Sequence, residues 1–166
     1  MDLLELKDEL SKIKQDDVLL LKSLLNNRGK IFLIGNGGSN SICSHIAQDY
    51  TKALGKPALA FSDPSRLTCY INDYGRDHAY SKFLEHFATT GDLCILISSS
   101  GNSMNIVNAA KFCKCSDIDF IILTGFDENN KLRSEYSDDS ELDFHVSSKD
   151  YGIVENLHCI FLHSVI

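Results

Sequence analysis

Short runs of apolar residues alternate along this chain with longer segments in which apolar residues recur every three or four positions. The apolar runs stand at 30–34, 58–61, 93–98, 120–124 and 142–146. Runs of this length between turn residues are typical of strands that are buried on both faces. The pattern therefore predicts five strands.

Segments with helical spacing precede, separate and follow these runs. The first, residues 2–27, ends at the turn signal Asn26-Asn-Arg-Gly29 and can break near Gln15-Asp-Asp17. The last ends without the glycine or basic residue that often closes a helix, so either its end packs against another surface or the chain continues. The other predicted helices cover about 39–52, 77–89, 103–114 and 152–166.

Buried strands that alternate with helices predict the α/β class, with a five-stranded parallel sheet between two layers of helices. No repeat, low-complexity tract or polar linker divides the 166 residues. We therefore expect one domain overall, in which residues 1–27 form an additional N-terminal helix and residues 28–166 form the α/β unit.

Charge and composition exclude several kinds of protein. With 16 Lys and Arg against 23 Asp and Glu, the net charge is −7, so no overall positive field attracts nucleic acid. No apolar run approaches the roughly 18 residues of a membrane helix, and residues 1–9 do not resemble a secretory signal. The six cysteines form no paired CxxC framework. These features predict a cytoplasmic protein with mostly reduced thiols and with neither nucleic acid nor membrane as a partner.

Two polar loops follow predicted strands and lead into predicted helices. In Gly35-Asn-Gly-Gly-Ser39, glycines let the backbone approach a ligand closely, and the helix start offers free N–H groups to an anion. The loop Ser98-Ser-Ser-Gly-Asn-Ser103 adds several hydroxyls. Either loop alone is an ordinary turn or helix cap. Ligands bind at the carboxyl ends of parallel strands, so the two loops together predict a phosphomonoester site.

A nucleotide site is a weaker interpretation of the glycine loop. Gly35 and Gly37 match the first half of the GxGxxG fingerprint, and Asp63 follows the next strand, but the third glycine position is Asn40. No Lys-Ser or Lys-Thr pair follows the glycines, so the phosphate-binding Walker pattern is also absent. We expect no nucleotide cofactor.

Two predicted helices carry residues suited to metal binding and proton transfer. His45 and Asp49 are four positions apart in one helix, and Glu155 and His163 are eight apart in the last. Two imidazoles and two carboxylates can bind Zn²⁺ or a similar divalent ion. Polar pairs at this spacing also abound on solvated helix faces, and His158 competes with His163 for the same role. The spacing alone does not decide between these interpretations.

The glycine loop, the serine loop and the intervening Asn72-Asp73 resemble the sugar isomerase (SIS) domain, and within it the phosphoheptose isomerase branch. The resemblance covers about residues 28–166. It implies a flavodoxin-like SIS fold, residues 1–27 as an oligomerisation helix, and a homotetramer with sites at subunit junctions. It also implies conversion of sedoheptulose 7-phosphate to D-glycero-D-manno-heptose 7-phosphate, for lipopolysaccharide or capsule precursors.

The resemblance also implies roles for single residues. His45 and His163 match zinc-binding histidines, whereas Asp49 stands where the branch has a Glu and Glu155 where it has a Gln. One Zn²⁺ per subunit is expected on these four residues, with Asp49 and His163 as the proton-transfer residues of an aldose–ketose isomerisation through an enediol. The residues expected to bind substrate are Asn36, Gly37, Gly38, Ser39, Asn72, Asp73, Ser98, Ser99, Ser100, Ser103 and Glu155.

An alternative of another class is a non-catalytic SIS module that binds a phosphosugar or associates with a replication initiator. Where the branch has Asp-Arg-x-Gln, this chain has Gly152-Ile-Val-Glu155, so a related sugar phosphate is also an open choice of substrate. A binding module has no need of His45, Asp49, Glu155 and His163 together. The four residues therefore favour the enzyme.

Overall fold

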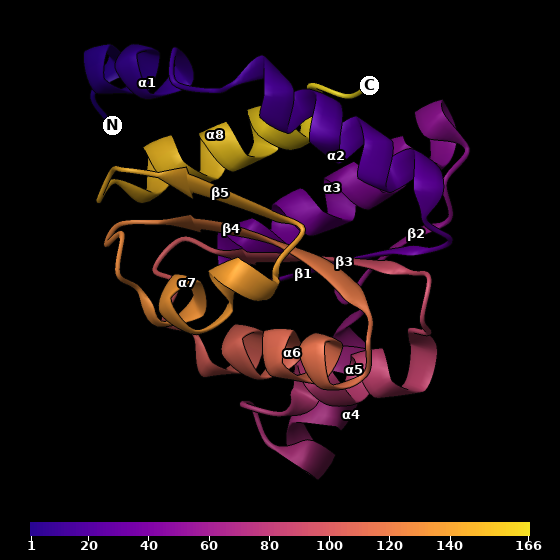
Figure 1. Ribbon diagram of the computed structural model, residues 1–166. Coiled ribbons are helices and arrows are strands. Elements are labelled where there is room, and N and C mark those ends of the chain that lie inside the picture. Colours follow the sequence, from indigo (N-terminus) through magenta and orange to yellow (C-terminus); the bar gives the residue numbers. More distant parts are fainter.

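Five parallel strands form one sheet in the order β2-β1-β3-β4-β5 in the computed structural model, which describes residues 1–166 (Figure 1). Every pair of neighbours in the sheet runs parallel. The predicted five-stranded parallel α/β fold is therefore confirmed. The strands are β1 (Ile31–Gly35), β2 (Ala58–Ala60), β3 (Leu93–Ser98), β4 (Asp119–Gly125) and β5 (Leu142–Val146).

The burial of each strand follows from its place in the sheet. All residues of β1 and β3 are buried, as continuous apolar runs in the middle of a covered sheet should be. The edge strand β5 alternates buried and half-buried positions, and the other edge strand, β2, has only three residues, none of them buried.

Helices cover both faces of the sheet and bury two separate cores (Figure 1). On one face lie α2 (Gln15–Asn27), α3 (Gly37–Leu54) and α8 (Tyr151–His163), with α1 (Leu3–Leu10) next to α8. On the other face lie α4 (Pro64–Tyr74), α5 (Ala79–Phe87), α6 (Met104–Cys115) and α7 (Lys131–Tyr136), the last followed by a 3-10 turn at Ser137–Asp139. No helix has the length and apolar composition needed to cross a bilayer.

Two helices were not predicted from the apolar spacing. Helix α4 has no buried residue, but its start carries recognisable signals, because Asp63 accepts a hydrogen bond from Arg66 N (2.9 Å) and Pro64 occupies the first turn. Helix α7 is one short segment capped by Asn130. The N-terminal segment does break, into α1 and α2, close to the position expected.

Helices α3 and α8 run side by side in the same direction. Near their starts, the carboxylate of Glu155 lies against Gly38. Near their ends, Tyr50 Oη donates a hydrogen bond to the carbonyl oxygen of Leu162 (2.8 Å). Both helices begin at the carboxyl edge of the sheet, so side chains from either can share a site there.

Candidate active site

The glycine loop after β1 and the serine loop after β3 line one cleft at the carboxyl edge of the sheet. The two strands are neighbours, with Gly35 paired to Ile97, so the loops that follow them lie next to each other. The cleft has a volume of about 240 Å³. Its lining residues are Asn36, Gly37, Gly38, Ser39, Ile97, Ser98, Ser99, Ser100, Ser103, Tyr151 and Glu155.

The chemistry of this lining suits an anion held by neutral donors. Ser98 and Ser99 are each only 5% exposed, and neither hydroxyl has a hydrogen-bond partner. An unpaired buried hydroxyl costs about 1–3 kcal/mol, so these two groups indicate a polar ligand. Helices α3 and α6 both start at this cleft without a side-chain cap, which leaves backbone N–H groups free for an anion.

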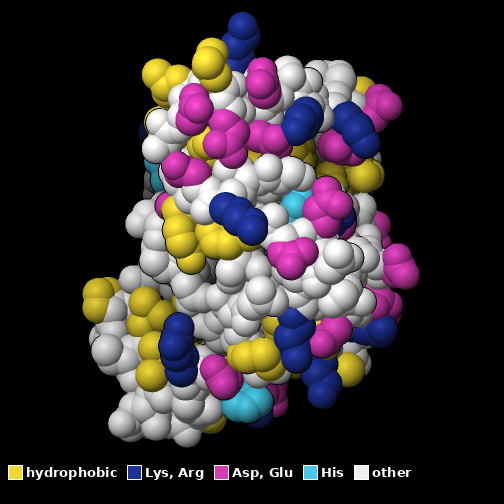
Figure 2. All heavy atoms as spheres, turned by 90° about the vertical axis from the view of Figure 1, so that its left-hand side faces the viewer, with side chains coloured by type: hydrophobic (Ala, Val, Ile, Leu, Met, Phe, Trp, Pro, Cys, Tyr) yellow, Lys and Arg dark blue, Asp and Glu magenta, His cyan; other side chains and the backbone are white.

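Figure 2 faces this edge of the sheet. White surface, which is backbone and uncharged polar side chains, makes up much of this view, and the basic side chains on it are few and scattered, one of them near the middle. No Lys or Arg lines the cleft. A phosphate group in this cleft would therefore meet hydroxyls, backbone amides and helix dipoles, not basic side chains.

Asn36 has a structural role that its sequence position did not reveal. Its side-chain amide forms a reciprocal pair with Asn105, with N···O distances of 3.0 and 2.8 Å. Tyr80 Oη donates to the same Asn36 oxygen (3.0 Å). Because its amide is already bonded within the protein, Asn36 fixes the glycine loop, and Asn105 and Tyr80 are supporting residues that the sequence analysis missed.

Glu155 packs onto the start of α3. A Cβ atom added at Gly38 would lie 2.2 Å from Glu155 Oε2, so only a glycine leaves room for this carboxylate. Burial raises the pKa of Glu155 above its ordinary value. The carboxylate therefore belongs to the wall of the cleft.

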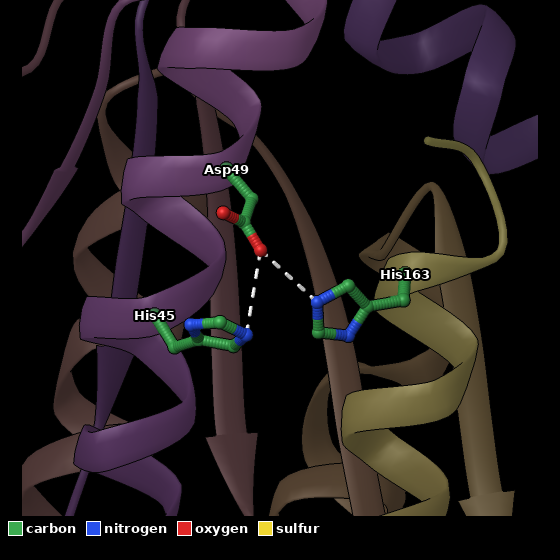
Figure 3. Close-up of side chains that lie close together, drawn as sticks. All are labelled: His45, Asp49 and His163. Carbon is green, nitrogen blue, oxygen red and sulfur yellow. Dashed lines mark hydrogen bonds and ion pairs between the residues drawn. The ribbon is translucent and has the colours of Figure 1, made fainter.

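His45, Asp49 and His163 form a second cluster, between the middle of α3 and the last turn of α8 (Figure 3). Asp49 Oδ2 lies 3.3 Å from His45 Nε2 and 3.2 Å from His163 Nε2. One ligand atom from each residue lies within 4.8 Å of the other two. The structure thus brings together three of the four predicted metal ligands.

The hydrogen bonds of His163 prepare its outer nitrogen to bind a cation. Its Nδ1 lies 3.0 Å from the carbonyl oxygen of Cys159, which can only accept, so Nδ1 carries the proton. In the neutral ring, the lone pair of Nε2 then faces the Asp49 carboxylate. Two acceptors at this distance repel unless a proton or a metal ion lies between them, so the cluster fits a metal ion.

Glu155 is not one of the three residues whose ligand atoms lie within 4.8 Å of one another. It precedes His163 by eight positions, a rise of about 12 Å along the helix, and its carboxylate lies against Gly38. Its role as a fourth metal ligand therefore stays a prediction. Three residues form the cluster, and the fourth lines the cleft.

Three further predicted or competing residues lie elsewhere. Asn72 and Asp73 are exposed on α4, where Asn72 Nδ2 donates to Asp73 Oδ1 (3.0 Å), and they do not line the cleft in this chain. His158 is fully buried, and its Nε2 donates to the carbonyl oxygen of Thr124 (3.0 Å). His158 is thus a core residue and does not replace His163.

Comparison with known proteins agrees with this fold. The SIS domain model matches residues 4–125. A phosphoheptose isomerase of Fusobacterium nucleatum is 32% identical over 167 aligned residues, which cover 98% of this chain and 81% of that protein. The solved structure of phosphoheptose isomerase GmhA from Neisseria gonorrhoeae has a TM-score of 0.86 and 32% identity, covering 98% of this chain and 89% of the other.

The chain therefore belongs to the SIS domain family. Its place within that family is with the phosphoheptose isomerases. The phosphoheptose isomerase of Glaesserella parasuis is 38% identical over 121 residues, which are 70% of this chain and 63% of that protein. The matched part spans about three fifths of the length of several such relatives.

Proposed function

We propose that this protein is an isomerase that converts sedoheptulose 7-phosphate to D-glycero-D-manno-heptose 7-phosphate, a precursor for lipopolysaccharide or capsule. The observation that carries the proposal is the presence in one chain of a cleft with unpaired buried hydroxyls, Ser98 and Ser99, and a His–Asp cluster on helices that start at that cleft. Family membership and the names of the relatives support it. A module that only binds a phosphosugar has no use for the cluster.

The phosphate end of the substrate binds at the starts of α3 and α6. The hydroxyls of Ser98, Ser99, Ser100 and Ser103 donate to phosphate oxygens, together with the free backbone N–H groups of the two helix starts. These phosphate-binding contacts are far from the reacting carbons. They supply affinity and orientation rather than proton transfer.

The reacting end lies at the cluster. Asp49 takes a proton from C1 of the open-chain ketose and returns it to C2, which needs a carboxylate oxygen with a free lone pair. Its Oδ2 faces both imidazoles, so Oδ1 is the oxygen available. The proton that leaves O1 must reach O2 to complete the conversion through the enediol. His163, the predicted acid–base partner, can move this proton through Nε2 only while that nitrogen does not ligate a metal ion.

His45, Asp49 and His163 would hold one Zn²⁺ per subunit, which when bound polarises the substrate carbonyl and offsets the negative charge of the enediolate. His163 is oriented for this role by its bond to Cys159. In this proposal Glu155 contributes to substrate binding at the cleft wall, not to the metal. Asn72 and Asp73 contribute only if a second subunit brings them to a site.

The proposal includes a cytoplasmic homotetramer in which residues 1–27 serve oligomerisation. Exposed leucines on α1 and α2, and exposed Ile160 on α8, support an apolar contact surface. All six cysteines are free, which agrees with a reducing compartment.

Turnover of a panel of ketose and aldose phosphates, with and without a chelator, tests the function. We expect His163→Ala to lower kcat about 100-fold or more, the scale of lost acid–base catalysis. Ser100→Ala should mainly raise KM, because it contacts the unreactive phosphate. If no sugar phosphate is isomerised, the function is wrong. If His163→Ala keeps full activity while Ser100→Ala loses it, the proposed mechanism at the cluster is wrong and only the phosphate site is supported.

A further inference from the structure

Phe126 adopts an unusual backbone conformation at the edge of the cleft. It directly follows β4 and has a φ of 64°, in the left-handed region that bulky side chains rarely occupy. Its backbone N–H donates to the carbonyl oxygen of Ser148 (3.0 Å), and its side chain packs partly against the core. Such conformations persist where the surrounding structure imposes them, and they are concentrated at functional sites.

The ring of Phe126 supports the ring of Tyr151. The two ring centres are 4.8 Å apart with an angle of 77° between the planes, an edge-to-face contact. Tyr151 is the first residue of α8, and Asp150 fixes this helix start by accepting hydrogen bonds from Gly152 N and Ile153 N. Phe126 thus supports one side of the Tyr151 ring, and Asp150 fixes the backbone from which the ring projects.

Tyr151 gives the polar cleft its one accessible apolar surface. The only other hydrophobic lining residue, Ile97, is fully buried, whereas Tyr151 is 58% exposed. The remaining lining groups are serines, glycines, Asn36 and Glu155, which can bind a phosphate and hydroxyls. They offer nothing to the C–H groups of a carbon chain.

We propose that Tyr151, held by Phe126, is a specificity-determining residue whose ring packs against the carbon chain of the sugar phosphate next to the phosphate group. This inference rests on the proposed function. An aromatic ring favours C–H surface and is indifferent to inorganic phosphate, so it separates a sugar phosphate from the phosphate ion, which the serines alone cannot do. Tyr151 acts on binding and not on the reacting atoms.

Steady-state kinetics can separate these two contributions. The KM for sedoheptulose 7-phosphate reports the whole substrate, and the inhibition constant of inorganic phosphate reports the phosphate subsite alone. For Tyr151→Ala we expect KM to rise about 5- to 10-fold, the scale of one aromatic contact, with the phosphate inhibition constant within about 2-fold of wild type. Tyr151→Phe, the matched control, should keep the wild-type KM.

A second variant tests the support given by Phe126. Phe126→Gly removes the ring, while glycine adopts the positive φ without strain. We expect a rise in KM in the same direction as for Tyr151→Ala but smaller, again with an unchanged phosphate inhibition constant. The unchanged inhibition constant also shows that the cleft has folded in both variants.

Three outcomes would overturn the inference. The first is a wild-type KM in Tyr151→Ala, and the second is an equal loss of affinity for substrate and inorganic phosphate. The third is a Tyr151→Phe variant as weak as Tyr151→Ala, which would assign the effect to the hydroxyl. The first two contradict only the inference if wild type isomerises the substrate. A wild-type protein without turnover contradicts the proposed function as well.

Discussion

A single missing side chain shapes the candidate site at Gly38. Any Cβ at this position would collide with the carboxylate of Glu155, which is the flexible end of a long side chain and can move away. We therefore expect Gly38→Ala to fold with little loss of stability but to displace the carboxylate into the cleft and raise KM. Substrate kinetics and thermal unfolding of the variant measure both effects.

A double-mutant cycle combines Gly38→Ala with Glu155→Ala. In that background the methyl group of Gly38→Ala meets no carboxylate, so the second substitution should add little. A coupling free energy of about 0.5–3 kcal/mol between the two positions is expected for residues in contact. Strictly additive effects on KM would show that the two groups do not interact.

His158 makes the stability of the protein sensitive to acid. Full burial lowers the pKa of His158 to about 4, whereas in the unfolded chain the ring takes up a proton below about pH 6.5. Above about pH 6.5 the ring is neutral in both states and does not oppose folding. As the pH falls from 6.5 toward 4, protonation of the ring in the unfolded chain lowers the stability of the folded protein. The linkage predicts a drop in the free energy of unfolding of about 2 kcal/mol between pH 7 and pH 5 from this residue.

His158→Gln is the informative variant, because its amide can still donate to the carbonyl oxygen of Thr124 but does not titrate. Urea unfolding at pH 7 and pH 5 should show a smaller loss of stability in the variant than in wild type. If both proteins lose the same free energy, another group is responsible. His145 is the next to test, since burial lowers its pKa too.

Residue roles were only partly predictable from the sequence. The serine and glycine loops were found because each directly follows a buried apolar run. Spacing showed that Glu155 and His163 share a helix face, but not that they meet different partners along α3. Spacing also could not show whether His158 or His163 faces the core, because this depends on how α8 packs on β4 and β5. The hydrogen bonds between Asn36 and Asn105 could not be predicted either, because they join positions 69 apart in the sequence.

At the level of elements, the pair of α3 and α8 sets the geometry of the cluster. Tyr50 is fully buried, and its hydroxyl donates to the carbonyl oxygen of Leu162, one of the last carbonyls of α8. Tyr50→Phe leaves this buried acceptor unpaired. We expect a loss of about 1–3 kcal/mol in the free energy of unfolding, measured by chemical denaturation.

The same variant should also affect activity, since Tyr50 adjoins Asp49 and Leu162 adjoins His163. A lower kcat with an almost unchanged KM would show that the bond holds the two helices in register at the reacting end. Ser44→Ala, which removes only a bond within α3 to the carbonyl oxygen of Asn40, is a suitable control. Unchanged stability in Tyr50→Phe would contradict the expectation.

Element prediction succeeded where burial was strong and failed where it was weak. Continuous apolar runs identified all five strands, and helical spacing found every helix except α4 and α7. Helix α4 has no buried residue and was missed, although Leu67, Tyr70, Ile71 and Tyr74 recur in it at helical spacing. Its start could still have been found from Asp63 and Pro64, a helix cap followed by a residue suited to the first turn.

For the whole molecule, the exposed leucines of the N-terminal helices predict self-association. Leu3, Leu4 and Leu19 are 68%, 73% and 55% exposed, and Figure 2 shows hydrophobic side chains at the upper end of the molecule, where α1 lies. Apolar surface of this kind usually meets a partner. We expect a stable oligomer, with the tetramer as the proposed state, in analytical ultracentrifugation at micromolar concentration.

Leu19→Glu should weaken this association by placing a charge on the apolar surface. Lys22→Glu changes a charge on the same helix without removing apolar area, so it should leave the oligomer intact. A wild-type protein that sediments as a monomer would remove the prediction.

The parallel course of α3 and α8 has a consequence for the choice of substrate. The serine loop lies at the starts of these helices, whereas the cluster of His45, Asp49 and His163 lies further along them, at the middle of α3 and the end of α8. The rise along α8 from Glu155 at the cleft to His163 is about 12 Å. One molecule can engage both places within a chain only if it is long enough to reach. Under the proposed function, this spacing favours an extended seven-carbon phosphate over a three-carbon one, because only the longer chain reaches from the serine loop to the cluster.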